Sequence, residues 1–269
     1  MKAKYIYALS IACIMLSPAF SQDRNFAYNY QSTVLNKGQR DFEVWNTYKT
    51  GRAELFRQLD QRLEFEVGLT SKLQTSFYLN SSQKTYQDSA VLITEPAEIS
   101  FSNEWKFKLT DPVANGIGSA LYVEVGLASH EYDLELKLIL DKKIDRHMLV
   151  ANLVSEFEYE TEMTDENGEF EVDNELEILP EIDLGYQYLI KDNFGIGLEA
   201  VNRNVMKEGE LEHSALFGGP TVFYGSDRWW LIFNTLPQIT AIKSENNESL
   251  DLNEFQKYEF RLLFAYMFN

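Results

Sequence analysis

The strict alternation of residue types from Tyr258 to Phe268 constrains the fold more than any other feature of the sequence. Every second side chain there, Phe264 among them, is apolar and mostly aromatic, whereas the positions between include Glu259 and Arg261. A period of two indicates a β-strand whose faces meet different environments. The last residues of a chain usually fray unless they are tied down. We therefore expect the closing strand of a transmembrane β-barrel, in which no edge stays unpaired.

Similar alternation recurs along the chain from residue 39 onward. About twelve segments show it, the tenth and eleventh less cleanly: 39–49, 56–69, 72–81, 98–110, 117–128, 131–141, 147–160, 172–189, 193–204, 212–224, 228–240 and 258–268. Pro180, Pro220 and Pro237 lie inside such segments, where we expect bulges or early strand ends because proline cannot donate to a ladder. The sequence thus predicts an all-β chain, a closed antiparallel transmembrane β-barrel of about twelve strands in meander order over residues 39–269.

The connections between these segments alternate in length. Short ones lie at 70–72, 111–116, 142–145, 190–192 and 225–227; those between them include the long polar stretches 82–97, 161–171, 205–211 and 241–254, with 50–55 and 129–130 as short exceptions. Outer-membrane barrels have short periplasmic turns and longer outward loops, so both chain ends are expected to face the periplasm. A soluble sandwich or lipocalin-like barrel also alternates apolar and polar residues, but gives no reason for this parity.

The first 21 residues have the features of a cleaved signal peptide. Lys2 and Lys4 precede an apolar stretch at 6–16, and 19–21 is a small-x-small cleavage site. A membrane anchor is an alternative, although the apolar stretch is shorter than the roughly 20 residues that span a bilayer. A lipoprotein start at Cys13 is another. Cys13 is the only cysteine, so the mature chain would hold no disulfide, which suits a bacterial envelope.

Residues 22–38 form a polar and aromatic leader before the first predicted strand. A periplasmic arm, an extra half-strand and a segment inside the lumen are all compatible with its sequence. The formal charge of the whole chain is −18, and it becomes −20 without the two lysines of the predicted signal. This acidity argues against a nucleic-acid partner.

The chain resembles bacterial outer-membrane β-barrels, and more narrowly a family of such barrels with no assigned function. The stretches that carry the narrower resemblance are Leu35-x-Lys37-Gly38, Glu43-x-Trp45, Gly218-Gly219-Pro220, Trp229-Trp230 and Leu236-Pro237-Gln238. The resemblance implies an outer membrane of a Gram-negative bacterium, with its lipid and the barrel-assembly machinery as partners, and a role in transport. It brings no catalytic residues and no cofactor. Asn269 after Phe268 departs from the terminal aromatic residue that is common in such barrels.

The polar faces of the predicted strands would line the lumen. They carry fourteen acids (Glu64, Glu66, Glu104, Glu124, Asp133, Glu135, Glu156, Glu158, Glu175, Glu177, Glu181, Asp183, Glu199 and Glu259) and seven bases (Arg62, Lys106, Lys108, Lys137, Arg203, Lys257 and Arg261). An open lumen with this excess of acids would prefer cations. A narrow lumen filled by a salt-bridge network would conduct nothing, and twelve strands lie between the filled and the open barrel sizes.

Aromatic residues on the apolar faces are candidates for interface anchors, as in the girdles of membrane barrels. The candidates are Trp105, Tyr186, Tyr188, Trp229, Trp230 and Phe268. Because Trp229 and Trp230 are adjacent, at most one of them can face lipid.

Motifs for catalysis or metal binding are not evident. His213 and Ser214 are adjacent, so they would point to opposite faces of a strand, and no Gly-x-Ser-x-Gly or histidine pair occurs. The Asp165-x-Asn167-Gly168 stretch fails as a calcium loop, since Met163 and Asn174 stand where acids are needed. We expect a channel or transporter for small, preferentially cationic solutes. The alternatives are a non-conducting structural or surface-binding barrel and an acyl-hydrolase.

Overall fold

The computed structural model describes residues 24–88, 91–166 and 169–268, so the predicted signal peptide lies outside the described residues. The described chain is all-β. Its strands are β1 (Arg40–Thr50), β2 (Phe56–Gly68), β3 (Leu73–Asp88), β4 (Val91–Thr94), β5 (Glu98–Thr110), β6 (Gly118–Leu127), β7 (Glu131–Ile144), β8 (His147–Glu166), β9 (Glu169–Lys191), β10 (Phe194–Lys207), β11 (Glu210–Gly225), β12 (Trp229–Thr235), β13 (Gln238–Lys243) and β14 (Tyr258–Phe268).

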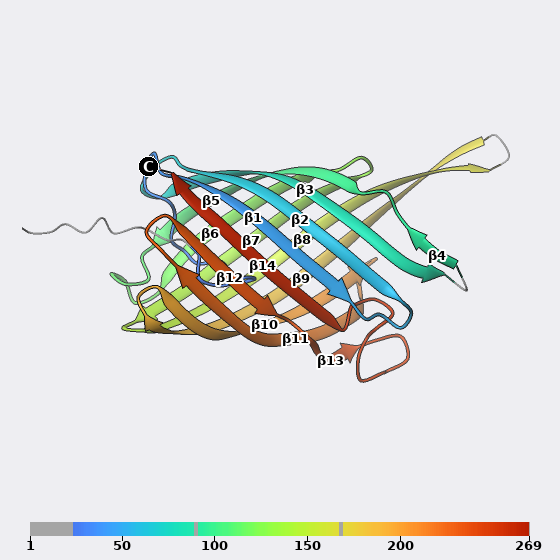
Figure 1. The fold of residues 1–269 in the computed structure, drawn as a ribbon. Helices are drawn as coiled ribbons and strands as arrows, with labels where there is room; N and C mark the ends of the chain where they lie inside the picture. The colour runs from blue at the N-terminus through green and yellow to red at the C-terminus, as the bar shows by residue number, and fades with distance from the viewer. Residues whose placement is uncertain (1–23, 89–90, 167–168, 269) are drawn as a thin grey trace, which may run out of the picture.

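These strands close into an antiparallel barrel of twelve positions in meander order, as the sequence predicts (Figure 1). The closure lies between β1 and β14, which pair continuously from Arg40–Phe268 to Thr50–Tyr258. Strands β12 and β13 share the eleventh position, both beside β11. Strand β4 pairs only with the end of β3 and extends that hairpin.

The barrel is apolar outside and largely polar inside. Along β14, Phe264 and Tyr266 are about 40 % exposed on the outer face, whereas Leu263, Ala265 and the inward Glu259 are buried. An apolar outer face with every backbone group paired around a closed ring is the condition for a sheet to sit in hydrocarbon. No helix in the described residues is long and apolar enough to cross a bilayer.

The two ends of the barrel differ. Short turns and the two ends of the described chain lie at one end, and the hairpin of β8 and β9 projects furthest from the other (Figure 1). The stretches 82–97 and 161–171, expected to be loops, are largely strand, since β3 runs to Asp88 and the β8–β9 hairpin runs to Glu166 and Glu169. Beyond the membrane both faces of a strand meet water, so these extensions lack the alternation that reveals a strand.

All three prolines coincide with gaps in the ladders. Pro237 separates β12 from β13, and opposite it the β11 ladder breaks between Phe217 and Thr221, where Pro220 lies. Near Pro180 the β9–β10 ladder skips from Arg203–Glu181 to Met206–Ile178. The expected early strand end is seen at Pro237. At Pro180 and Pro220 the strands β9 and β11 continue, and only the ladder on one side of each has a gap.

Residues 24–35 of the leader run through the interior of the barrel (Figure 1). We call this segment the plug. Phe26, Ala27, Asn29 and Ser32 are fully buried, and all the other plug residues except Thr33 are buried as well. The barrel therefore has a filled core in which the N-terminal segment, rather than side chains from the wall alone, occupies the centre.

Candidate functional site

A single carboxylate on β10 binds the backbone of the plug. Glu199, which is 1 % exposed, accepts hydrogen bonds from the backbone N–H groups of Ala27, Tyr28 and Asn29 at 2.8–3.0 Å. Side-chain amides of Asn29 and, from β12, Asn234 donate to the same carboxylate at 3.0 Å. Three successive N–H groups converging on an anion form a nest, and hydrogen bonds to an ionised acceptor are the stronger kind.

Neutral amides of the wall hold the rest of the plug. On β8, Asn152 accepts from the backbone N–H of Tyr30 at 2.7 Å and donates to its carbonyl at 2.9 Å. Gln187 donates to the carbonyl of Asn25 at 3.0 Å. Gln74 accepts from the N–H of Leu35 at 2.8 Å. These contacts satisfy backbone groups that would otherwise be buried without partners.

The closing strand β14 contributes charges to the same contact. Arg261 donates to the carbonyl of Ala27 at 3.2 Å, and its guanidinium lies 3.8 Å from the ring centre of Tyr28. Glu259 accepts from the Tyr28 hydroxyl and from Arg203 at 2.8 Å. The inward charges of β14 thus hold the plug from the side opposite the Asn152 contact.

The plug lies between two cavities. The outer cavity measures about 550 Å³ and has Tyr28 and Tyr30 of the plug in its lining. The inner cavity, at the end with the short turns, measures about 280 Å³ and is lined by Asn25, Gln31 and Thr33 of the plug. The two share no lining residue, so the plug separates them.

The inner cavity has a fixed charge at its edge, in the turn between β5 and β6. Lys108 donates a hydrogen bond to Asp111 at 2.6 Å. Together with the backbone N–H groups of Ala114 and Val113, it lowers the pKa of Asp111 to about 2. Asp111 is therefore a permanent anion at neutral pH.

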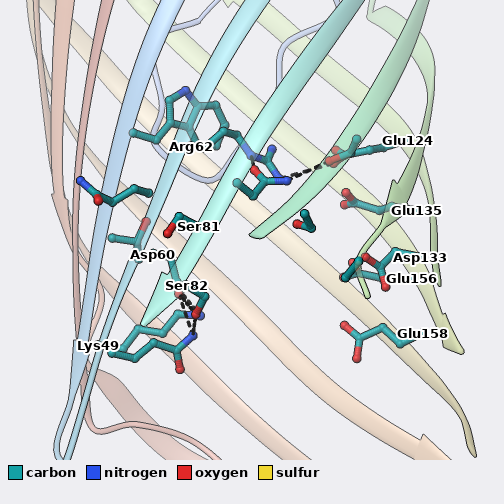
Figure 2. A pocket seen from close by; sticks show the side chains of 18 of the residues that line it. Lys49, Asp60, Arg62, Ser81, Ser82, Glu124, Asp133, Glu135, Glu156 and Glu158 are labelled. Atoms are coloured by element: carbon teal, nitrogen blue, oxygen red, sulfur yellow. Dashed lines mark hydrogen bonds and ion pairs between the residues drawn. The ribbon is translucent and has the colours of Figure 1, made fainter. Parts of the chain in front are cut away.

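Acids outnumber bases in the lining of the outer cavity. Ten acids (Asp60, Glu98, Glu124, Glu131, Asp133, Glu135, Glu156, Glu158, Glu181 and Asp183) face six bases (Lys49, Arg62, Lys84, Lys137, Arg203 and Arg261). Figure 2 shows Glu124, Asp133, Glu135, Glu156 and Glu158 on one wall, and Lys49 and Arg62 on the other. The cavity is therefore a vestibule with one strongly acidic wall.

Part of this charge is balanced by ion pairs. Arg62 lies 3.4 Å from Glu124, Lys137 lies 2.5 Å from Glu135, and Arg203 lies 3.3 Å from Glu181. In the described part of the chain, Glu156 and Glu158 make no ion pair within 4.0 Å, and carboxylate oxygens of Glu131, Asp133 and Glu158 lie within 4.8 Å of one another. The acidic wall thus holds carboxyl groups that the bases of the vestibule leave without an ion pair.

Most of the sequence-predicted lumen residues do face inward. Glu64, Glu66, Glu104, Lys106, Glu124, Glu199 and Glu259 are buried in the interior, and Arg62, Glu135, Lys137, Glu156, Glu158, Glu181, Asp183, Arg203 and Arg261 line the vestibule. Asp133 also lines the vestibule, and Lys108 pairs with Asp111 at the end of β5. Three further predicted residues lie elsewhere. Glu175 and Glu177 pair with Lys207 at 2.8 and 2.6 Å on the outer extension of β9, and Lys257 precedes β14, where its N–H donates to the carbonyl of Gly51. Alternation alone does not reveal that β9 continues past the barrel at Glu175 and Glu177, or that β14 begins only after Lys257.

Of the two adjacent tryptophans, of which at most one could face lipid, Trp230 is the one that is not an interface anchor. Trp230 is fully buried and faces the interior, whereas Trp229 faces outward and packs against Tyr224 and Phe264. The other candidates are on the outer face: Trp105, Tyr186, Tyr188 and Phe268 are 36–45 % exposed. The order of the two tryptophans follows from the register of β12 with β14, which pairs Trp229 with the outward Tyr266.

Several site residues escaped the sequence analysis. They are the amides Asn152, Gln187 and Gln74, which bind the plug, and Asn234, which donates to Glu199. Neutral amides at inward positions of strands otherwise rich in charge were the available signal, because an amide can match both the N–H and the C=O of a backbone.

The histidine and serine considered for catalysis have separate partners. His213 bonds Asp251 in the loop before β14 at 2.7 Å, and the Ser214 hydroxyl donates to Asn204 at 2.7 Å. Both contacts tie loops or strands together, and in the described residues His213 and Ser214 do not bond each other.

The closed barrel with an apolar exterior and a filled lumen has the fold of outer-membrane β-barrels. It is similar to the translocator domain of the autotransporter NalP from Neisseria meningitidis, with TM-score 0.58 and 10% identity over 87% of this chain and 89% of that one. The β domain of the Bordetella autotransporter BrkA is similar with TM-score 0.56 and 9% identity, over 87% of this chain and 100% of that one. The KdgM porin is similar with TM-score 0.52 and 9% identity, over 85% of this chain and 99% of that one.

The chain belongs to a family of unknown function, DUF6662, whose sequence profile matches residues 18–268. A search of curated proteins finds no match.

Proposed function

We propose that the protein is an outer-membrane channel or transporter for small, preferentially cationic solutes, closed in this conformation by the plug. The observation that carries the proposal is the vestibule of about 550 Å³, in which ten acids face six bases. A pathway whose lining carries more charges of one sign than of the other concentrates ions of the opposite sign and selects for them.

The acidic wall supplies the selectivity in this proposal. Carboxylates of Glu131, Asp133 and Glu158 cluster within 4.8 Å, and Glu156 lies beside them on β8. A small cation that enters the vestibule would exchange part of its water shell for these oxygens. The similar fold of the KdgM porin supports a role in transport.

The plug is the gate in this proposal. Its backbone is held by side chains, Glu199 and Asn152 above all, rather than by a ladder with a strand. Such contacts can be released without unpairing the barrel wall, because these hydrogen bonds are not part of the ladders that join the wall strands. Movement of the plug would join the outer and inner cavities into one path.

Single-channel recording in planar bilayers tests this. We expect small or rare currents from the intact protein and steady currents from a variant that lacks residues 24–35. In a KCl gradient the reversal potential of that variant should show cation preference. The further change of Glu156 and Glu158 to glutamine should reduce the preference, while Glu54→Gln in the exposed loop between β1 and β2 should not.

A second function is favoured by the number of bonds that hold the plug: a non-conducting barrel that binds ligands at its outer vestibule. A folded, plug-deleted protein without current would establish this alternative and overturn the channel. Should the deletion prevent folding, Glu199→Gln loosens the plug in a complete chain and serves in its place.

The location is part of the same proposal. The outward apolar band would contact outer-membrane lipid in a Gram-negative cell, and the barrel-assembly machinery would insert it after export. Outward aromatic side chains such as Trp105, Tyr186 and Trp229 would anchor it at the interfaces.

A further inference from the structure

One side of the vestibule carries acids in successive rows that lead from its mouth to the plug. The pairing of β7 with β8 and of β8 with β9 sets the inward side chains of these strands into rows, about 6–7 Å apart along the strands. From the mouth to the plug, the acids in four successive rows are Asp133 and Glu158, Glu135 and Glu156, Glu181, and Asp183 (Figure 2). We call these six residues the acidic column.

Asp183, in the row nearest the plug, is buried without a partner of its own. It lines the vestibule, is 4 % exposed and stands opposite Asn152, which binds Tyr30 of the plug. Its Oδ1 atom has no hydrogen-bond partner, and no base lies within 4.0 Å of its carboxylate among the residues that the structure describes. A buried carboxylate is costly unless a cation or donor pairs with it.

The nearest bases are already engaged. Lys137 and Arg203 act on Asp183 through space, but each has a closer carboxylate partner, at 2.5 and 2.8 Å. Glu156 and Glu158, nearer the mouth, also lack an ion pair within 4.0 Å in the described ranges. The acidic column therefore has carboxyl groups without an ion pair both at the mouth and beside the plug.

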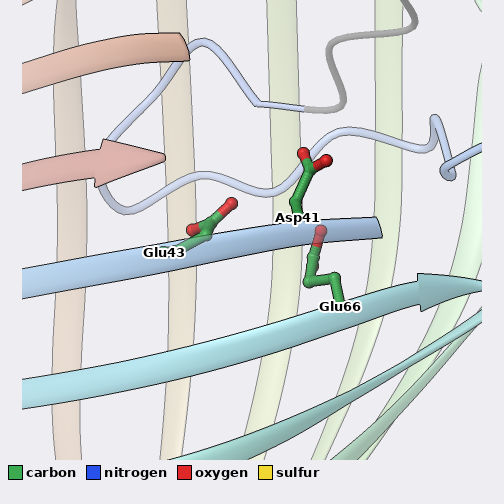
Figure 3. Close-up of side chains that lie close together, drawn as sticks. All are labelled: Asp41, Glu43 and Glu66. Atoms are coloured by element: carbon green, nitrogen blue, oxygen red, sulfur yellow. The ribbon is translucent and has the colours of Figure 1, made fainter. Parts of the chain in front are cut away.

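Buried acids elsewhere in the barrel differ from Asp183. Figure 3 shows Asp41, Glu43 and Glu66, which rise from β1 and β2 beside the N-terminal segment. Glu66 accepts from Gln74 at 3.0 Å, and Glu43 accepts from an indole N–H at 2.7 Å. None of the three is without a partner. These acids are buried with contacts that hold them, whereas Asp183 is buried without one.

The acidic column already binds one alkylammonium group, which belongs to the protein itself. Nζ of Lys137 lies 2.5 Å from Glu135, and 4.2 and 4.7 Å from the ring centres of Tyr30 and Tyr122. An ammonium group on a carbon chain gains from both contacts, because the carboxylate meets its charge and the rings also accept its methylene groups. The vestibule floor thus has the chemistry that an amine ligand requires.

The spread of the carboxyl groups without ion pairs selects a long cation. A metal ion gathers its oxygen ligands around one point, at about 2.0–2.6 Å. Glu158 and Asp183 lie three rows apart, too far for one ion. A linear polyamine carries several ammonium groups joined by short methylene chains, with a spacing similar to that of the rows. The vestibule volume of about 550 Å³ is in the range of sites that hold small organic ligands.

We propose that the acidic column is a binding site for a linear aliphatic polyamine. One ammonium group would pair with Asp183 beside the plug, and others with Glu156 and Glu158 nearer the mouth. A polyamine would then be the cationic solute of the proposed function, on which this inference rests, although its binding can be measured without any current.

Isothermal titration calorimetry tests this on the full barrel, refolded into uncharged detergent free of lipopolysaccharide. The probes are spermidine, butylamine and CaCl2. We expect spermidine to bind at least about tenfold more tightly than butylamine, because it makes several charge-assisted contacts instead of one. Asp183→Asn should weaken spermidine binding by about tenfold or more, and so should Glu156→Gln combined with Glu158→Gln.

Glu175→Gln is the matched control. Glu175 is an exposed acid on β9, the strand of Asp183, and pairs with Lys207 at 2.8 Å on the outer extension, so the variant removes one charge outside the vestibule. An equal loss of spermidine binding in Glu175→Gln, or calcium bound as tightly as spermidine, would overturn the site. So would a wild type that binds spermidine no better than butylamine, a comparison that needs no variant to fold.

The polyamine site and the channel can fail separately. A barrel that binds spermidine in this way but passes no current after deletion of the plug keeps the polyamine site and loses the channel. A plug-deleted barrel that conducts, with a wild type that does not distinguish spermidine from butylamine, keeps the channel and loses the polyamine site.

Discussion

At the scale of single residues, the interior shows how much one side chain does for a segment with no ladder of its own. Glu199 accepts from three successive N–H groups, and Asn152 pairs with both backbone groups of Tyr30. The sequence predicts that Glu199 faces inward, because inward position follows from a period of two. It does not predict the partner, which comes from 170 residues away in the chain.

Replacing Glu199 by glutamine tests the nest. Glutamine offers one acceptor oxygen instead of two, so at least one buried N–H loses its partner, at a cost of about 2 kcal/mol. We expect hydrogen exchange of the backbone amides at 27–29 to accelerate by roughly thirtyfold, measured by mass spectrometry on the folded barrel. Glu54→Gln in an exposed loop is the control. Equal protection in both variants would contradict the role given to Glu199.

At the scale of elements, alternation predicts most strand positions because the faces of these strands meet lipid and an enclosed interior. The closing strand, expected at 258–268, is Tyr258–Phe268 in the structure, and 98–110 is Glu98–Thr110. The method fails where both faces meet water, as in the outer part of β3 and β4. The break at Pro237, which splits one expected strand into two, follows from the proline and not from alternation.

The break at Pro237 depends on a glycine in the facing strand. A Cβ added to Gly219 would lie 1.9 Å from the carbonyl oxygen of Thr235, a backbone atom that cannot rotate away. We expect Gly219→Ala to destabilise the barrel by about 1–3 kcal/mol or more through overpacking, seen as a lower melting temperature and loss of heat-modifiable migration. Gly116→Ala, where nothing lies within 4 Å, should leave both unchanged. A Gly219→Ala barrel as stable as the wild type would show that the backbone at the Pro237 break can move to make room for the methyl group.

At the scale of the whole molecule, the closed fold follows from the sequence but the filled lumen does not. Strand number, meander order and loop parity are local patterns repeated along the chain. The plug has no period, and its place depends on amides and charges of β3, β8, β9, β10, β12 and β14 that meet only after the barrel closes. Two of the motifs that carry the family resemblance lie at such contacts. Glu43 and Trp45 contact Arg24 of the plug, and 218–220 faces 236–238 across the proline gap.

Loop parity also predicts how the whole molecule is oriented, and labelling of single cysteines on cells tests that. Cys13 is the only cysteine and belongs to the predicted signal, so an introduced thiol would be the only one in the mature chain. We expect Asn246→Cys, in the exposed loop after β13, to react with a membrane-impermeant maleimide on intact cells. Gly116→Cys, in the turn between β5 and β6 at the opposite end, should react only after the outer membrane is permeabilised. The reverse pattern would place the vestibule toward the periplasm. Its acidic wall would then select solutes leaving the periplasm rather than those arriving from outside.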